Sequence, residues 1–426
     1  MPTFRRPGFL AAIALFDLLS AGCATPPAAV PAVVTDIVPY CAGQDLVVDA
    51  RFEGGNIHSC RVTGYRRVEI LVRPEDAPPI NPSSWYAFRI SANGDQPVEA
   101  VIRFEGGPAR YWPKLSSDRN YWRPARDAEA RFNEDGSSLQ LVVRPNAPML
   151  WVAGQPLVLG AYYADWLDAL DALDHVSTRV FGHSVEGRPL IAAMTEARPE
   201  TVYLFGRQHP PEVSGALAMR SFVDAILGDT DLARQFRRRY QLVVVPLINP
   251  DGVAHGHWRH NMNGIDLNRD WGPFTQPETN SLRQLVGSIE SGGARPALML
   301  DFHSTDDSLF YTQLPEESSW PIDFAMAWFE RARARIPNFP FRHEPRAKSE
   351  QANTKNYFFD RYRIPALTYE VGDEVAPDEI VATTPVFAEE MMRLLLEYSA
   401  AEQVSKRDNP IANEGRGPAV PLSSPH

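Results

Sequence analysis

Two histidines and one glutamate in this sequence are spaced so that folding could bring them to one metal ion. His209 and Glu212 stand three positions apart in the run His-Pro-Pro-Glu, and His303 directly follows an apolar run that ends at Phe302. Two imidazoles and one carboxylate are the donor set of zinc sites that keep a position open for water or substrate. Each residue taken singly is more often an ordinary surface or core side chain. The zinc hypothesis therefore depends on the elements that position all three.

The segments before these residues are apolar and β-rich. The runs Thr201–Phe205 and Ala297–Phe302 predict buried central strands. In open α/β sheets, ligands bind outside the carboxyl ends of the strands. Because His209, Glu212 and His303 all follow such a run, we expect them at one edge of a sheet.

Further polar motifs lie between these segments and after them. In chain order they are Asn249-Pro250-Asp251-Gly252, Trp258-Arg259, Asp266-Leu267-Asn268-Arg269 and, after an apolar run, Glu370. With the first two segments, this order resembles the M14 family of zinc metallocarboxypeptidases over residues 162–396. The resemblance implies a zinc-dependent enzyme with one zinc ion per chain and a peptide substrate that has a free C-terminus.

The resemblance assigns the metal and the chemistry to five residues. His209, Glu212 and His303 would hold zinc. Glu370 would act as general base and acid, and Arg259 would stabilise the negative charge that forms on the scissile carbonyl oxygen. Zinc lowers the pKa of a bound water toward about 7, which supplies the nucleophile that peptide hydrolysis otherwise lacks.

Further residues would orient a ligand and recognise the substrate. Asp266 would hold the other ring nitrogen of His209. Asn268 and Arg269 would bind the C-terminal carboxylate, a task suited to the fork of a guanidinium group. Lys355, fifteen positions before the general base, aligns with the residue at the base of the side-chain pocket in the family. A buried ammonium needs a carboxylate partner, so an inward Lys355 predicts preference for C-terminal Glu or Asp. The alternative is that Lys355 faces solvent.

One element of the family pattern is missing. Many members carry a mobile tyrosine that caps the substrate in the loop before the pocket residue, and residues 346–351 contain no tyrosine. Two other enzyme hypotheses stay open: a cell-wall carboxypeptidase whose diaminopimelate substrate offers Lys355 an extra carboxylate, and a related N-acyl amino acid deacylase. A catalytically inactive binding module would be expected to lose Glu370 or a ligand, and this chain keeps them all.

The periodicity of the sequence divides the chain into two folded parts. Residues 42–148 contain short alternating runs separated by turn signals, which predict a small antiparallel β-sandwich. Residues 155–402 alternate β-rich and amphipathic runs, which predicts an α/β domain with a central mixed sheet flanked by helices. Arg51–Ile57 and Trp85–Phe88 resemble the sandwich that precedes the catalytic domain in the cytosolic carboxypeptidase branch, where many members remove glutamates. The predicted helices are Asp165–Leu173, Ser214–Leu227, Glu278–Ile289, Phe324–Arg335 and Pro385–Ala400.

Residues 1–22 are typical of a secretory signal. Arg5 and Arg6 precede an apolar run that is too short to span a bilayer. Cys23 then follows small residues, which resembles a bacterial lipoprotein processing site, although Leu19 lies one position farther from the cysteine than in that pattern. Lipidation of Cys23 and ordinary cleavage both stay open. Either outcome predicts an exported protein of a bacterium, periplasmic or anchored to the membrane through lipid.

The remaining segments and the composition complete the prediction. Residues 23–41 predict a linker, and residues 403–426 predict a disordered tail. Cys41 and Cys60 are an even pair in an exported protein, which favours a disulfide over two unrelated buried thiols. The chain of 426 residues carries a formal net charge of −11, and an acidic surface argues against a nucleic-acid partner.

Overall fold

The computed structural model describes residues 39–76, 83–94, 96–145, 149–346 and 351–408. The described residues cluster as one compact unit, so the predicted sandwich and the predicted catalytic domain belong to a single body. The predicted signal segment, Cys23, most of the linker and residues 409–426 lie outside the described residues. No described helix is both long and apolar enough to cross a membrane.

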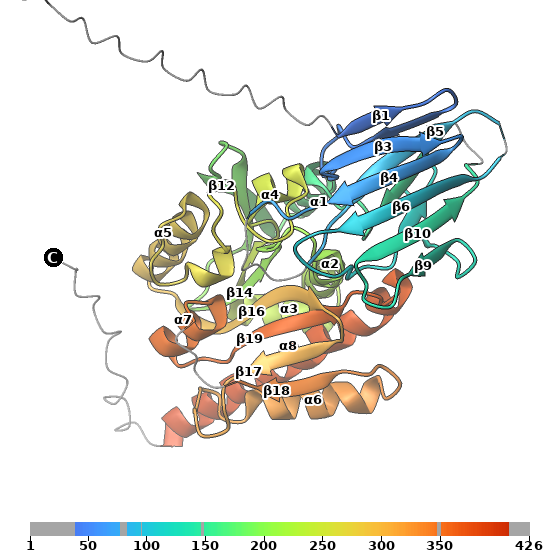
Figure 1. Ribbon diagram of the computed structural model, residues 1–426. Helices are drawn as coiled ribbons and strands as arrows, with labels where there is room; N and C mark the ends of the chain where they lie inside the picture. The colour runs from blue at the N-terminus through green and yellow to red at the C-terminus, as the bar shows by residue number, and fades with distance from the viewer. Residues whose placement is uncertain (1–38, 77–82, 95, 146–148, 347–350, 409–426) are drawn as a thin grey trace, which may run out of the picture. The chain divides into compact units, whose positions relative to one another are not determined.

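The N-terminal part is a β-sandwich of two sheets (Figure 1). Inward side chains alternate along its strands: Val68, Ile70 and Val72 are almost fully buried, while the residues between them are more exposed. The first sheet has the strand order β1 (Tyr40–Ala42), β2 (Leu46–Asp49), β5 (Ala87–Ala92), β11 (Leu150–Ala153), β7 (Lys114–Ser116) and β8 (Arg123–Pro124). The second sheet has the order β3 (Ser59–Gly64), β4 (Arg67–Val72), β6 (Val98–Phe104), β10 (Ser138–Val143) and β9 (Ala130–Phe132).

Two features differ from the predicted antiparallel sandwich that ends at residue 148. β4 and β6 pair in parallel, so the second sheet is mixed. β11 pairs with β5 and β7 and ends at Ala153, so the sandwich extends past the predicted boundary. All four residues of β11 are buried. It therefore lacks the alternation that identifies a half-exposed strand in a sequence.

The C-terminal part is built on an eight-stranded mixed sheet within the described residues. Its four central strands, β15, β14, β16 and β19, run parallel to one another, and antiparallel neighbours lie on both sides of them. The strand order is β12 (Val176–His183), β13 (Pro189–Thr195), β15 (Tyr240–Val245), β14 (Glu200–Gly206), β16 (Arg295–Thr305), β19 (Ala366–Gly372), β17 (Leu309–Thr312) and β18 (Arg342–Pro345). This arrangement confirms the predicted fold class.

Helices cover both faces of this sheet, as its side chains require. On β14, Val202 and Leu204 enter the core on one face, whereas Tyr203 and Phe205 enter the core on the other. Both faces are apolar because strands covered on both sides need no polar face. Side chains of α2 (Val213–Leu227), α3 (Asp231–Arg239), α6 (Phe324–Arg335) and α8 (Pro377–Asp408) join the first core, and those of α5 (Pro277–Ser291) and α7 (Thr354–Tyr362) join the second. The remaining helices are α1 (Gly160–Asp171), α4 (Pro250–His255) and the 3₁₀ helix η1 (Leu267–Arg269).

The last helix differs from its predicted bounds at both ends. α8 begins at Pro377, and the predicted start, Pro385, lies inside the helix. Proline is favoured in the first turn of a helix, and here Pro377 followed by Asp378 and Glu379 forms that turn. At the other end the helix continues to Asp408. The first residues of the predicted disordered tail are therefore helical.

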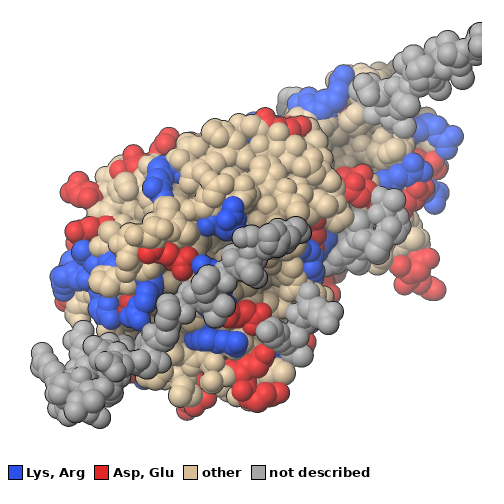
Figure 2. Space-filling view, turned by 90° about the vertical axis from the view of Figure 1, so that its left-hand side faces the viewer, with Lys and Arg blue, Asp and Glu red and all other residues tan. Residues whose placement is uncertain are grey.

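Charged side chains on the surface form many local ion pairs. Arg331 pairs with Glu397 at 2.7 Å, and Arg342 pairs with Asp307 at 3.2 Å. Figure 2 shows one face of the molecule, on which basic and acidic side chains lie intermixed. Each exposed pair contributes little to stability, about 0–1 kcal/mol.

A disulfide joins the two sheets of the sandwich. Cys41 on β1 and Cys60 on β3 are bonded, with their Cα atoms 5.8 Å apart and a sequence separation of 19. A cross-link of this span removes conformational freedom from the unfolded chain, which stabilises the folded state by about 3 kcal/mol.

Replacing Cys41 and Cys60 together by serine should lower the free energy of unfolding by about 2–4 kcal/mol. The measurement is urea denaturation with and without a thiol reductant. Reductant should destabilise the wild-type protein and leave the double variant unchanged. Equal sensitivity of the two proteins to reductant would show that the bond does not form.

Candidate metal centre and active site

The carboxyl ends of three parallel strands place the predicted site residues together. β14 ends at Gly206 and leads into the loop of His209 and Glu212, and Glu212 directly precedes α2. β16 carries His303, and β19 carries Glu370 directly opposite it in the strand register. α2 can approach β16 closely because residue 215 is a glycine: a Cβ atom there would lie 2.4 Å from the carbonyl oxygen of His303.

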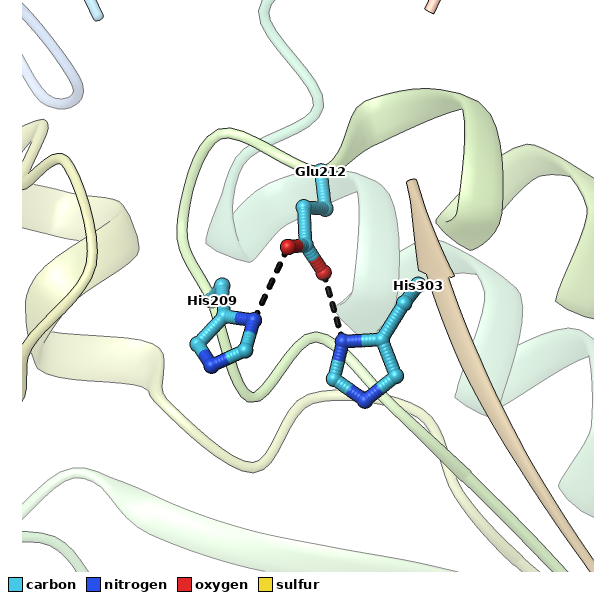
Figure 3. Close-up of side chains that lie close together, drawn as sticks. All are labelled: His209, Glu212 and His303. Atoms are coloured by element: carbon cyan, nitrogen blue, oxygen red, sulfur yellow. Dashed lines mark hydrogen bonds and ion pairs between the residues drawn. The ribbon is translucent and has the colours of Figure 1, made fainter. Parts of the chain in front are cut away.

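The three predicted metal ligands meet in one buried cluster. Nδ1 of His209 lies 2.8 Å from one carboxylate oxygen of Glu212, and Nδ1 of His303 lies 2.7 Å from the other. Figure 3 shows the carboxylate of Glu212 between the two rings. Each residue offers one ligand atom, and these three atoms lie within 4.8 Å of one another. All three residues are at most 5% exposed. This compact set is suited to bind one metal ion.

The outer nitrogens of both rings contact carboxylates. Nε2 of His209 lies 3.0 Å from Oδ1 of Asp266, and Nε2 of His303 lies 2.8 Å from Oδ2 of Asp301. If each Nε2–H donates to its carboxylate, each Nδ1 presents a lone pair toward Glu212. Three acceptors then converge, and a cation relieves their repulsion. The donor set of two imidazoles and one carboxylate fits zinc.

Asp301 is a site residue that the motifs did not identify. It precedes His303 by two positions on β16, and alternate residues of a strand point to the same face. That spacing could have identified it. Asp301 is fully buried, and Gln208 donates from Nε2 to its Oδ2 at 2.7 Å. Asp301 is therefore positioned to hold the ring of His303 as Asp266 holds the ring of His209.

Arg259 is connected to the cluster of predicted metal ligands by Asp266, which contacts both Arg259 and His209. Its Nε and Nη2 atoms donate to Oδ2 of Asp266 at 2.8 and 2.7 Å. Burial alone would raise the pKa of Asp266, but His209 and Arg259 outweigh burial and hold that pKa well below its usual range. Asp266 therefore stays ionised and connects a metal ligand with the arginine predicted to stabilise the oxyanion.

The two residues predicted to bind the substrate carboxylate lie close by on η1. Nδ2 of Asn268 lies 3.3 Å from Nε2 of His303, while its Oδ1 accepts from the backbone N–H and the hydroxyl of Thr354. Arg269 is more exposed, and its Nη1 donates to the carbonyl oxygen of Asn268 at 2.7 Å. Asn268 is thus held at the metal cluster, with Arg269 next to it at the surface.

Lys355 is buried, so the alternative in which it faces solvent is wrong. It is 5% exposed, and its Nζ donates to the carbonyl of Thr312 at 3.3 Å and to Oδ1 of Asn356 at 3.1 Å. Burial lowers its pKa to about 8, although the nearby carboxylates Glu317 and Asp360 oppose the shift. Within the described residues, no carboxylate lies at ion-pair distance from Nζ.

Glu370 stands opposite His303 in the register of β16 and β19. Burial raises its pKa to about 7, while the neighbouring His303 opposes the shift. Tyr311 lies on the adjacent strand β17. Burial and the nearby charge of Glu370 both raise the pKa of Tyr311.

The loop in which the family carries its capping tyrosine includes residues 347–350, which lie outside the described residues.

The sandwich also contributes a side chain next to the site. Arg110 donates from Nε to Oδ2 of Asp373 at 2.6 Å and from Nη2 to the carbonyl oxygen of Ser304 at 2.8 Å. Ser304 follows His303, and Asp373 follows the strand of Glu370, so Arg110 connects the ends of β16 and β19. Motif spacing could not identify Arg110, because it comes from the other part of the chain.

Known proteins share this architecture. The sequence model of the zinc carboxypeptidase family matches residues 163–318, and that of the cytosolic carboxypeptidase N-terminal domain matches residues 48–154. A metallo-carboxypeptidase from Burkholderia cenocepacia has a TM-score of 0.67 at 21% identity, over 84% of this chain and 100% of its own. One from Pseudomonas aeruginosa, in complex with (2-guanidinoethylmercapto)succinic acid, has a TM-score of 0.67 at 19% identity, over 82% and 99%.

Two sequence relatives extend the comparison. An uncharacterised protein of Zymomonas mobilis is 23% identical over 352 residues, which are 76% of this chain and 87% of that protein. Human cytosolic carboxypeptidase 6 is 28% identical over 288 residues, which are 61% of this chain and 56% of the human protein. The aligned region thus spans little more than half of the human relative.

The fold and the site together define a metallocarboxypeptidase. The chain belongs to the M14 zinc carboxypeptidase family and carries the cytosolic carboxypeptidase N-terminal domain before its catalytic domain. The catalytic-domain match ends before Lys355 and Glu370. The positions of these two residues beside the site come from the structure.

Replacing Asp301 or Asp266 by asparagine should weaken zinc binding about 10–100-fold, because each carboxylate orients a ligand histidine. The measurement is competition for zinc with a chelator of known affinity. Asp229→Asn is the control, since Asp229 is exposed and pairs only locally with Arg234. Zinc affinities equal to that of the control would contradict the assignment of these two carboxylates.

Proposed function

We propose that the protein is a zinc-dependent carboxypeptidase that removes C-terminal residues with acidic side chains. The observation that carries the proposal is the meeting of His209, Glu212 and His303 at a sheet edge where Glu370 stands opposite His303. Arg259 and Asn268 contact the same cluster through Asp266 and His303. Metal ligands, a proton acceptor and groups that bind anions are the parts that hydrolysis at a free C-terminus requires.

Each side chain has a defined task in the proposed reaction. His209, Glu212 and His303 would hold zinc, which would supply Lewis-acid activation of water and of the scissile carbonyl. Glu370 takes a proton from the attacking water and delivers it to the leaving amine. Arg259 donates to the carbonyl oxygen as it becomes negative, and Asp266 fixes the direction of its guanidinium group. Asn268 and Arg269 bind the terminal carboxylate of the substrate.

The preference for acidic residues rests on Lys355. Its ammonium group is buried and lies at hydrogen-bond distance from only neutral oxygens within the described residues. A buried cation gains from an anionic partner, and a Glu or Asp side chain of the substrate would supply one. Thr354, the preceding residue, contacts Asn268, which links Lys355 to the residue proposed to bind the terminal carboxylate.

Export of the protein is also part of the proposal. A disulfide such as Cys41–Cys60 persists in oxidising compartments, and residues 1–22 are typical of a secretory signal. Lipid attachment at Cys23 would hold the enzyme at a membrane surface. Cell-wall peptides that end in diaminopimelate would then be accessible, and their extra carboxylate could pair with Lys355.

Glu370→Gln should lower kcat about 10²–10⁴-fold with little change in KM or zinc content, because the amide cannot accept the proton. The measurement is release of C-terminal glutamate from a short peptide. Glu374→Gln is the control, since Glu374 lies four positions later and pairs with Lys114. Full activity of Glu370→Gln would contradict the mechanism.

Lys355→Asp should reverse the preference from C-terminal Glu to Lys or Arg, because the charge at the base of the pocket changes sign. The measurement is kcat/KM for peptides that differ only in the last residue. An unchanged order of preference would contradict the pocket assignment.

The discrimination between C-terminal Glu and Gln should depend on pH. The pKa of Lys355 lies at about 8, so the ammonium is charged below that pH and loses its proton above it. The ratio of kcat/KM for Glu over Gln should therefore fall as pH rises through about 8. Lys355→Arg stays charged and should remove this decline. If the ratio still declines with pH in the arginine variant, a group other than Lys355 causes the decline, which would contradict the prediction.

A further inference from the structure

One carboxylate of the sandwich holds the backbone of the loop that carries Arg259. Oε2 of Glu75 accepts from the N–H of Trp258 at 2.6 Å, and its Oε1 accepts from the N–H groups of Arg259 and His260 at 2.9 and 2.8 Å. Three consecutive backbone donors thus converge on one side chain from a distant part of the sequence. Hydrogen bonds to an ionised acceptor are stronger than those between neutral groups.

The surroundings of Glu75 favour this structural role over a second metal site. The side chain is 9% exposed, and with Asp76 and His260 it forms a cluster whose ligand atoms lie within 4.8 Å of one another. Both oxygens of Glu75 already accept backbone hydrogen bonds, and Nδ1 of His260 lies 2.6 Å from Oδ2 of Asp76. The cluster is therefore satisfied without a cation.

Arg259 is consequently fixed at both ends. Glu75 holds its backbone, and Asp266 holds its guanidinium group. Trp258, which precedes it, is fully buried. A preorganised donor stabilises a transition state only if its position is set before the reaction begins. Glu75 of the sandwich thus helps to fix the position of Arg259, the predicted oxyanion donor.

We propose that Glu75 is a positioning residue for Arg259, and that through it the N-terminal sandwich is a functional part of the active site. The proposal rests on the proposed peptidase function and on the role of Arg259 in it. Glu75 does not contact the reacting atoms. It acts by holding the loop that directs Arg259 toward the substrate carbonyl.

The test compares Glu75→Gln with a matched variant, Glu53→Gln. Glu53 is also a sandwich carboxylate that accepts a backbone N–H of the catalytic part, but its donor is Gly160 at the start of α1, at 3.0 Å. Glu75→Gln should lower kcat about 10–100-fold, the scale expected when a catalytic group shifts by about 1 Å. KM should change little, because Arg259 acts mainly in the transition state. Glu53→Gln should retain wild-type kcat.

Combination with Arg259→Ala separates positioning from general destabilisation. Loss of one oxyanion donor should lower kcat about 10²–10³-fold. In that background Glu75→Gln should cost less than about twofold more, because it acts through the missing side chain. A full additional loss in the double variant, or a kcat of Glu75→Gln equal to that of Glu53→Gln, would overturn the proposal.

Hydrogen exchange supplies a readout that does not depend on activity. In Glu75→Gln, the backbone amides of residues 258–260 should exchange faster, because a carboxamide offers one acceptor oxygen in place of two. Zinc affinity and exchange at β14 and β16 should stay as in the wild-type protein. Unchanged exchange at 258–260 would overturn the proposal. Failure of the peptidase function itself would be seen separately, as full activity of Arg259→Ala or an inactive wild-type enzyme.

Discussion

Nδ1 of His209, Nδ1 of His303 and the carboxylate of Glu212 meet in a buried cluster at the carboxyl edge of the sheet. If each ring carries its proton on Nε2, the three groups present lone pairs or negative charge to one another, and a cation offsets that repulsion. The structure holds them together with further carboxylates, Asp266 and Asp301, behind the two rings. A bound cation would satisfy the two imidazoles and the carboxylate together.

Side chains of the sandwich contact segments that surround the site. A metal centre at the end of a sheet stands on loops and strand ends, which are the most mobile parts of such a fold. Arg110 connects the ends of β16 and β19, and Glu75 holds the loop of Arg259. Both side chains come from the sandwich. These contacts restrain the ends of β16 and β19 and the loop of Arg259.

The parts of the site that follow local rules could be predicted from the sequence. His209 and His303 follow apolar runs, and the parallel strands bring them to one edge as expected. Asp301 was within reach of the same reasoning, since it lies on the face of β16 that carries His303. The mixed sheet and its helices followed from the alternation of apolar and amphipathic runs.

The remaining features depend on contacts between segments far apart in the chain. Glu75 accepts a hydrogen bond from the backbone N–H of Arg259, which lies 184 positions later in the sequence. No spacing rule connects the two residues. The burial of Lys355 depends on residues outside its own motif, such as Thr312, 43 positions away. β11 is buried along its whole length, and α8 contains Pro385 in its interior; in both cases tertiary packing overrides the local signal.

The central claim is that this site binds a metal ion and recognises a free C-terminus. The most direct measurement uses the zinc-loaded enzyme with two peptides of identical sequence that end in glutamate, one with a free terminal carboxylate and one amidated. The account predicts release of glutamate from the free acid and a rate lower by orders of magnitude for the amide, because Asn268 and Arg269 lose the anion that they are proposed to bind. Equal rates for the two peptides would contradict it.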